Sequence, residues 1–319
     1  MNKIFTTLLC FLIFTQFTFA KGTGTTMFQL LQMPTNAYDA ALANTSSAGE
    51  NSVIANPAIV PFLSRTIILT HSMYIQDTSY SVCDVNVPID EVSGINFSFC
   101  YFDMGSMTRT TRDSSGYKEL GTFNANDKLF TLSYGSEVFD SFLLGLSLKY
   151  IKQTIDDISY SGIAVSLSGL YFVSDIIYLS LNIKDIGPKV KGYSLPSTIN
   201  LSISGELTET LLGIVQIDNY YNDDFVEFKF AIENYLYEDI FSIRAGYVLP
   251  TKQYQGTNND FITNLTLGAG LNFMGVFVDY AWLPKKDLGN THMFSIKVSF
   301  KNYYEKIFKI IYFYFVYSN

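Results

Sequence analysis

Apolar and polar residues alternate along most of the chain between Thr66 and Phe300. The runs are about ten residues long and end in turns, which is the spacing of strands that cross a membrane. In one run, Val226, Phe228, Phe230 and Ile232 alternate with Glu227, Lys229, Ala231 and Glu233. A period of two places the apolar side chains on one face of a strand and the polar ones on the other. Two architectures share this pattern: a soluble sandwich with its apolar face inside, and a membrane barrel with its apolar face outside.

The alternation predicts fourteen strands, at 66–75, 79–88, 94–104, 128–135, 142–154, 162–172, 176–186, 197–205, 211–220, 225–236, 240–250, 262–273, 275–284 and 291–300. Turn-forming residues separate them, for example Asp140-Ser141, Asp156-Asp157 and Asn258-Asn259-Asp260. Gly105 to Asn126 and Gly187 to Ser197 are predicted as long loops, while Val173-Ser174-Asp175 and Met274 are predicted as tight turns. This asymmetry is typical of a barrel with short turns at one end and longer loops at the other.

The first twenty residues have the features of a secretory signal peptide. Lys3 gives a positive start, Ile4 to Phe14 is a short apolar run, and Thr18-Phe19-Ala20 precedes a cleavage site. The apolar run is too short for a spanning helix, which needs about 20 residues. We therefore expect export across the inner membrane, with 1–20 as the signal peptide.

Composition favours the membrane barrel over the sandwich. Charged residues make up 16% of the chain, whereas a soluble domain has about 25%. Beyond the signal peptide no apolar run is long enough for a helical span, so strands are the elements expected to cross the bilayer. The formal net charge of −8 argues against a nucleic acid partner, which requires a basic surface. The predicted fold is an all-β transmembrane antiparallel β-barrel of about 14 strands, located in the cell outer membrane.

Three further features concern the barrel interior and the ends. Residues 21–62 do not alternate and are expected to form short helices and turns, ended by Asn56-Pro57. Strand glycines fall mostly on the polar face, at Gly145, Gly246, Gly268 and Gly270, as a narrow lumen filled by another element would require; bends in a twisted sheet are the alternative. Residues 301–319 form a C-terminal extension to which the sequence assigns no role.

Cys83 and Cys100 lie in neighbouring predicted strands. A symmetric hairpin with its turn near Asp90 would place them opposite each other, where an exported protein can oxidise them. Pairing the apolar residues Val85 and Phe97 instead shifts the register by one residue and separates the cysteines. The sequence leaves both registers open.

Several segments resemble the PorV/PorQ-type outer-membrane barrels, which are related to the FadL-type transporters of hydrophobic compounds. The matching segments are Gly22 to Leu31, Asn56-Pro57-Ala58, Gly145 to Ile151, Asn182 to Val190 with Leu195-Pro196, Ile243 to Tyr247, and Asp279 to Pro284 with Leu288 to His292. The chain departs from the family at Asp39 to Ala43, where a Met-Gly-Gly stretch is usual, and at Met293, where Arg is usual.

The resemblance implies a barrel whose N-terminal segment, 21–62, folds inside as a plug, with 63–300 as the barrel. It also implies passage of small hydrophobic molecules or, as the alternative, a scaffold or shuttle role in protein secretion. The partners implied are outer-membrane lipid, the barrel assembly machinery, and hydrophobic small molecules or secreted proteins.

Two groups of residues are the candidates for this function. Asn56, Pro57 and Ala58 are candidates for gating the plug, because Asn bonds neighbouring backbone and Pro fixes one dihedral angle; a rigid turn is the alternative. Phe28, Leu30, Leu31 and Met33 are candidates for contacting a hydrophobic ligand, with packing of the plug against the lumen wall as the alternative.

Catalysis, metal binding and cofactors are not predicted. The two histidines, His71 and His292, are more than about 200 residues apart in sequence, and no nucleophile signature lies near either. His292 is expected to hydrogen-bond a loop. No Cys or His pair has metal-ligand spacing, and the acidic turns Asp156-Asp157 and Asp223-Asp224 are expected to be solvated.

Overall fold

The computed structural model describes residues 26–45, 56–114, 116–237, 240–250 and 261–300. The predicted signal peptide, the C-terminal extension 301–319 and the turn at Asn258-Asn259-Asp260 lie outside the described residues. The N-terminal segment is described in two pieces, 26–45 and 56–62.

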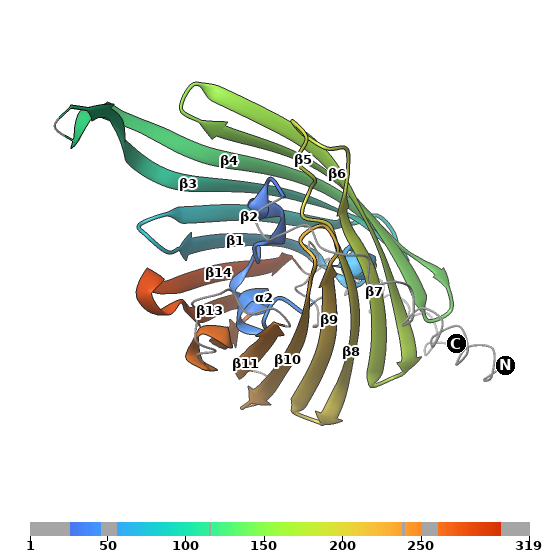
Figure 1. The fold of residues 1–319 in the computed structure, drawn as a ribbon. Helices are drawn as coiled ribbons and strands as arrows, with labels where there is room; N and C mark the ends of the chain where they lie inside the picture. Colours follow the sequence, from blue (N-terminus) through green and yellow to red (C-terminus); the bar gives the residue numbers. More distant parts are fainter. Residues whose placement is uncertain (1–25, 46–55, 115, 238–239, 251–260, 301–319) are drawn as a thin grey trace, which may run out of the picture.

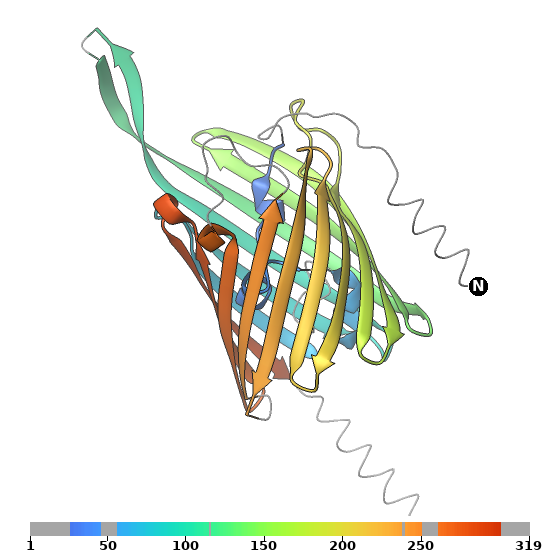
Figure 2. The same cartoon turned by 60° about the horizontal axis from the view of Figure 1, so that its bottom comes forward.

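Fourteen antiparallel strands form one closed barrel (Figures 1 and 2), which confirms the predicted fold. The strands are β1 Arg65–Met73, β2 Ser79–Pro88, β3 Ser93–Asp113, β4 Gly116–Phe139, β5 Phe142–Ile155, β6 Ile158–Ser174, β7 Ile177–Ile186, β8 Thr198–Thr208, β9 Leu211–Tyr220, β10 Phe225–Leu236, β11 Phe241–Pro250, β12 Leu265–Phe273, β13 Val276–Pro284 and β14 Asn290–Phe300. Each pairs with its neighbours in sequence, and β1 pairs with β14 from Arg65 opposite Phe300 to Met73 opposite His292. Closure leaves no sheet edge along the paired region.

The barrel wall has its apolar side chains outside and its polar side chains inside. In β5, Leu144, Leu146 and Leu148 are exposed on the outer face, while Ser147 and Lys149 are buried in the lumen. An apolar outer band around a polar interior is the arrangement of a transmembrane barrel and the inverse of a soluble sandwich. None of the helices among the described residues is long and apolar enough to cross a membrane.

The two ends of the barrel differ in their connections. The short-turn end carries tight connections such as Asp140-Ser141 and Met274-Gly275, together with the start of β1 and the end of β14. The opposite end, called here the long-loop end, carries the connection 187–197 between β7 and β8. Two 3-10 helices also lie at that end, η4 Phe261–Asn264 before β12 and η5 Lys286–Leu288 before β14.

The predicted long loop from Gly105 to Asn126 is wrong. Strands β3 and β4 continue through it and form a two-stranded hairpin that projects beyond the barrel rim at the long-loop end (Figures 1 and 2). Both of its faces are exposed to solvent. Neither face therefore requires apolar side chains, and the sequence lacks the apolar/polar alternation of the other strands.

The strand register separates the two cysteines. Val85 pairs with Phe97, so Cys83 lies opposite Phe99 and Cys100 lies opposite Val82. Cys83 is exposed on the outer face and Cys100 is buried on the lumen side, and both are free thiols. Pairing of the apolar faces therefore decides between the two registers.

The N-terminal segment lies inside the barrel (Figure 1). It forms η1 Gln29–Gln32 near the long-loop end, α2 Ala37–Ala41 at mid-height against β11 to β14, and η3 Pro57–Phe62 near the short-turn end against β2 to β6. Residues 46–55, where a helix ending at Asn56-Pro57 would lie, are outside the described residues. Asn56 begins η3, because its side chain caps the backbone N–H of Ala58 and the proline ring suits the first helical position.

Candidate functional site: the N-terminal segment and the lumen

Glycines in the wall provide the space that the N-terminal segment occupies. A Cβ atom added to Gly145 would lie 2.2 Å from the backbone nitrogen of Ala58, and one added to Gly135 would lie 2.4 Å from the carbonyl oxygen of Pro57. At Gly268 an added Cβ would lie 2.4 Å from the Cβ of Ala41. The backbone of the segment thus lies directly on the wall where side chains are missing. The lumen-filling interpretation of the inward glycines is confirmed at these contacts.

Helix α2 is held at mid-height by a buried ionic cluster. The Tyr38 hydroxyl donates to Oε2 of Glu233 over 2.7 Å, and the Tyr38 ring lies 4.3 Å from the Arg244 guanidinium carbon. Arg244 in turn pairs with Glu233 at 2.7 Å and with Asp279 at 2.6 Å. Both carboxylates therefore bond to Arg244, whose single positive charge offsets one of their two negative charges. The cluster joins α2 to β10, β11 and β13.

Backbone groups of the same segment bond to side chains of the wall. The N–H of Ala37 donates to Ser295 Oγ at 2.8 Å, and Thr266 Oγ1 donates to the carbonyl of Ala41 at 2.8 Å. The Tyr80 hydroxyl donates to the carbonyl of Pro34 at 3.0 Å. These bonds satisfy polar groups of a segment too short to satisfy them internally.

At the long-loop end, the segment is fixed to two connections between strands. The Thr26 hydroxyl donates to the Asp223 carboxylate at 2.9 Å, and the N–H of Met27 donates to the carbonyl of Ser194 at 3.0 Å. Leu195 of the β7–β8 connection is buried among the apolar residues of η1. Burial raises the pKa of Asp223, and the Thr26 hydrogen bond partly opposes this increase.

The predicted ligand-contacting residues pack against the wall at this end. Phe28, Leu30 and Leu31 are buried in a cluster with wall residues that include Tyr80, Leu129 and Ile151, and Met33 packs against its edge. Gly162 makes room for the ring of Phe28, since a Cβ there would lie 2.7 Å from the ring. Their arrangement is a packed core between the N-terminal segment and the wall.

The predicted gating residues lie at the opposite end. Asn56, Pro57 and Ala58 are all buried, and Ala58 packs with Val60, Leu143 and Leu170. The carbonyl oxygen of the Asn56 side chain accepts from the N–H of Ala58 at 3.1 Å. The two groups of predicted residues thus contact different parts of the lumen and do not form one site.

Between these two ends, further buried ion pairs line the lumen. Lys149 pairs with Asp185 at 2.7 Å, and Lys229 pairs with Asp218 at 2.6 Å and with Glu227 at 3.4 Å. Gln216 and Asn200 donate to the same carboxylate of Asp218, at 2.6 and 2.5 Å. Such hydrogen bonds offset part of the free energy that is lost when the charged groups of a buried ion pair leave water.

A cavity of about 460 Å³ opens beside η3 at the short-turn end. It has an aromatic wall: the Phe62 and Phe172 ring centroids are 5.3 Å apart, and those of Phe172 and Tyr178 are 5.1 Å apart, both in edge-to-face contact. Its other lining residues include Leu170, Leu211, Leu212 and Tyr235, with Glu206 and Glu209 at the rim. Aromatic side chains on the lumen face of β6 and β7, where small polar residues dominate, are the sequence signal that could have located it.

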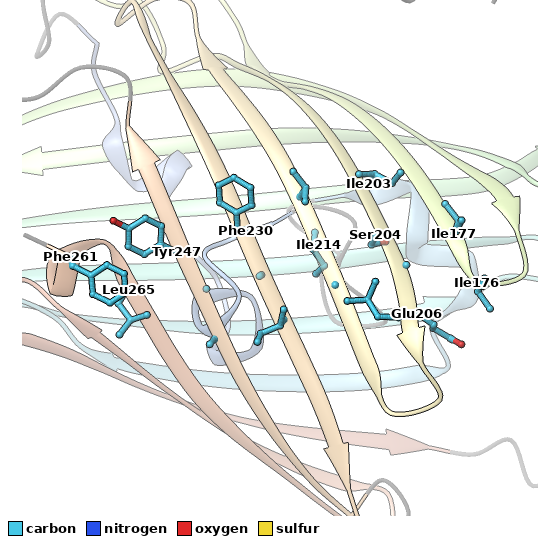
Figure 3. Close-up of a pocket in the computed structure, with 18 residues that line it drawn as sticks. Ile176, Ile177, Ile203, Ser204, Glu206, Ile214, Phe230, Tyr247, Phe261 and Leu265 are labelled. Atoms are coloured by element: carbon cyan, nitrogen blue, oxygen red, sulfur yellow. The ribbon is translucent and has the colours of Figure 1, made fainter. Parts of the chain in front are cut away.

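A second hollow, apolar and about 660 Å³ in volume, runs sideways over neighbouring strands of the wall, from the start of β7 to η4 (Figure 3). Exposed side chains of the outer face, among them Ile203, Phe230 and Ile232, form its sides. Gly205 and Gly213 pair with each other across β8 and β9 and leave the wall thin there. Hydrocarbon is the environment that suits this outer groove.

The two histidines lie outside the lumen. His71 contacts Ser81 Oγ through Nδ1 at 3.0 Å, and His292 contacts the Tyr280 hydroxyl through Nδ1 at 2.8 Å. Tyr280 belongs to strand β13, so the prediction that His292 bonds a loop is wrong. Among the described residues, no group of three or more His, Cys, Asp and Glu side chains is placed to hold a metal ion.

Solved structures share this architecture at low sequence identity. The toluene transporter TodX of Pseudomonas putida superposes with a TM-score of 0.59 and 11% identity, over 89% of this chain and 98% of that one. The toluene transporter TbuX of Ralstonia pickettii gives 0.59 and 12%, over 83% and 98%. A FadL homologue of Pseudomonas aeruginosa gives 0.55 and 11%, over 83% and 98%.

No protein-family model matches the chain, and no curated protein matches it. The three solved structures show that the fold is that of the FadL-type barrels. They are transporters or their homologues, not enzymes.

Proposed function

We propose that this protein is an outer-membrane channel through which small hydrophobic compounds pass, with the N-terminal segment as its plug. The observation that carries the proposal is the aromatic cavity beside η3, an apolar site in a lumen whose wall is otherwise largely polar. Its volume of about 460 Å³ lies in the range of pockets that enclose small ligands, and its lining is largely apolar. The shared fold with two toluene transporters supports the same class of ligand.

In this proposal η3 is the gate and α2 is the anchor. Helix α2 is bound through the Arg244 cluster and several backbone hydrogen bonds. In contrast, η3 contacts the wall glycines and has its internal Asn56 cap, and among the described residues its one side-chain bond to the wall is from the Asn86 amide to the carbonyl of Leu63 at its C-terminal end. Moving η3 therefore breaks fewer polar interactions than moving α2. Asn56, Pro57 and Ala58 would determine the position of η3 beside the cavity.

The test is the flux of toluene and of a fatty acid into liposomes that contain the full chain. Phe172→Ala and Tyr178→Ala should each change the rate of toluene and fatty acid entry relative to the wild type, because both rings line the cavity. Tyr171→Ala is the matched control, since Tyr171 neighbours Phe172 in sequence but is exposed on the outer face. Negligible flux in the wild type, or equal flux in all three variants, would refute the channel.

The projecting β3–β4 hairpin favours a second candidate, a scaffold or shuttle component for secreted proteins, as the resemblance to PorV/PorQ-type barrels also suggests. Beyond the pairing of Asp103 with Asn126, the hairpin strands pair with each other, and β4 meets β5 only from Ala125 onward. Such a ribbon offers strand edges to a partner chain. Replacing 106–124 by a two-residue turn should abolish co-purification of exported proteins under this second function and leave ligand flux unchanged.

A further inference from the structure

The aromatic cavity beside η3 carries negative charge without a compensating cation. Glu206 near the end of β8 and Glu209 in the turn before β9 both line it. None of the described residues around the cavity is Lys, Arg or His. In the described part of the chain neither glutamate forms an ion pair, whereas Asp185 and Asp218 elsewhere in the lumen each pair with a lysine. A ligand with a positive charge would therefore complement this cavity.

Aromatic rings form the walls of the cavity. The rings of Phe62 and Phe172 meet at an interplanar angle of 75°, and those of Phe172 and Tyr178 meet at 78°. Rings that are nearly perpendicular form adjoining walls of a box, whereas stacked rings form a single flat surface. The face of an aromatic ring carries partial negative charge, so a cation within about 6 Å of the ring centroid is attracted to it. A box of aromatic rings is an arrangement with which proteins recognise ammonium groups.

The carboxylates lie beside these rings. Tyr178 interacts electrostatically with Glu206 and Asp175, and its hydroxyl donates to the carbonyl of Asp175 at 3.1 Å. The N–H of Glu206 donates to the carbonyl of Ile176 at 3.0 Å, which holds the end of β8 against the start of β7 (Figure 3). An ammonium group at the rim would therefore meet both a ring and a carboxylate.

We propose that the cavity selects hydrophobic compounds that carry an ammonium group. This inference rests on the proposed function and specifies the ligand class of the channel. The hydrocarbon part of the ligand packs against the apolar lining, which includes Leu170 and Leu211, and the ammonium group lies at the rim near Glu206 and Glu209. A neutral compound such as toluene makes only the apolar contacts, and the carboxylate of a fatty acid is repelled by the two glutamates.

Three water-soluble probes that share a phenyl group test this selectivity. At neutral pH, 2-phenylethylammonium is positively charged, 2-phenylethanol is neutral and phenylacetate is negatively charged. Binding of each probe to the full chain in detergent micelles is measured by isothermal titration calorimetry, with protein-free micelles as the blank. The ammonium compound should bind about tenfold more tightly than the alcohol, because ring faces and carboxylates each contribute, and phenylacetate should bind most weakly. The preference should shrink between about 0.1 M and 1 M salt, because screening shortens the range of the carboxylates.

Substitutions separate the charge of the cavity from its apolar lining. Glu206→Gln combined with Glu209→Gln removes both charges at nearly unchanged size, so the affinity for the ammonium compound should fall close to that for the alcohol. Phe172→Leu keeps an apolar side chain but removes a ring face, and it should weaken binding of the ammonium compound more than binding of the alcohol. Glu91→Gln is the matched control, because Glu91 is an exposed glutamate between β2 and β3 at the same end of the barrel and does not line the cavity. It should leave the affinities for all three probes unchanged.

The outcomes distinguish this inference from the proposed function. Equal wild-type affinities for the ammonium compound and the alcohol would overturn the inference and leave the channel standing, because toluene flux tests the channel separately. A preference that persists in the doubly substituted variant would also overturn the inference. If no probe binds the wild type, the inference fails, and negligible toluene flux in addition would refute the channel. Heat-modifiable migration on gels confirms that each variant is folded.

Discussion

The glycine contacts of η3 lead to a strong prediction for Gly145→Ala. The added methyl group would lie 2.2 Å from the nitrogen of Ala58 and 2.3 Å from the carbonyl carbon of Pro57, where ordinary van der Waals contact begins at 3.4 Å. Backbone atoms cannot rotate away as a side chain can, so η3 must move off the wall. Gly145 pairs normally with Gly135 and Ser168, so the barrel itself should still close.

Overpacking of a well-filled interior costs about 1–3 kcal/mol. The contacts of Gly145 fall on backbone atoms, so we expect the upper part of this range. The loss should appear as a lower midpoint of thermal unfolding in detergent. If η3 is the gate, flux of toluene into liposomes should increase in the same variant, because the displaced segment opens the cavity.

Gly169→Ala is the matched control. Gly169 is on the next strand, and an added Cβ would lie 3.5 Å from the Phe142 ring and 3.8 Å from the Leu144 side chain, both ordinary contacts. Equal unfolding midpoints for wild type and Gly145→Ala would refute the placement of η3 on the wall. A lower midpoint without increased flux would retain the placement and refute the gating role.

Three further predictions concern the contacts that hold the N-terminal segment to the wall. Tyr38→Phe removes the 2.7 Å bond to Glu233 and should cost about 1–3 kcal/mol in unfolding free energy, because a buried carboxylate oxygen loses its donor; an unchanged unfolding midpoint would contradict this. Asp279→Ala removes the acceptor of Arg244 Nη1 but keeps the Arg244–Glu233 pair, so the unfolding free energy should fall by about 1–3 kcal/mol, the cost of a buried donor without its acceptor, whereas Asp175→Ala, in an exposed turn, should cost little. Burial raises the pKa of Asp223 above its ordinary value of 3.8, so its contribution to stability is fully present below that value and is lost as pH rises through the folded pKa. Asp223→Asn should remove this component from a plot of the unfolding midpoint against pH, and identical plots for the two proteins would contradict it.

The strands were predictable because alternate residues of each strand face lipid and lumen. This arrangement gives the apolar and polar residues of the sequence a period of two. The same reasoning missed the β3–β4 hairpin, since both of its faces meet solvent. It also could not predict the contact of Tyr38 with Glu233, which are 195 residues apart, because that contact depends on where the N-terminal segment lies in the lumen. The inward glycines were the partial exception: Gly145 and Gly268 indicated that something fills the interior, without showing which atoms touch them.

The path of the N-terminal segment also constrains how the molecule is assembled. Thr26 is bound at the long-loop end, α2 lies at mid-height, and the chain enters β1 at the short-turn end. The described parts of the segment therefore lie at both ends of the lumen and between them. The barrel is closed by the pairing of its first strand, β1, with its last strand, β14. Either β1 and β14 pair around an N-terminal segment that is already in place, or the segment enters a barrel that has already closed. Ser295 of β14 bonds to Ala37 of the N-terminal segment, so closure of the barrel and docking of this segment share a contact. A mutation that weakens either process is expected to slow the other.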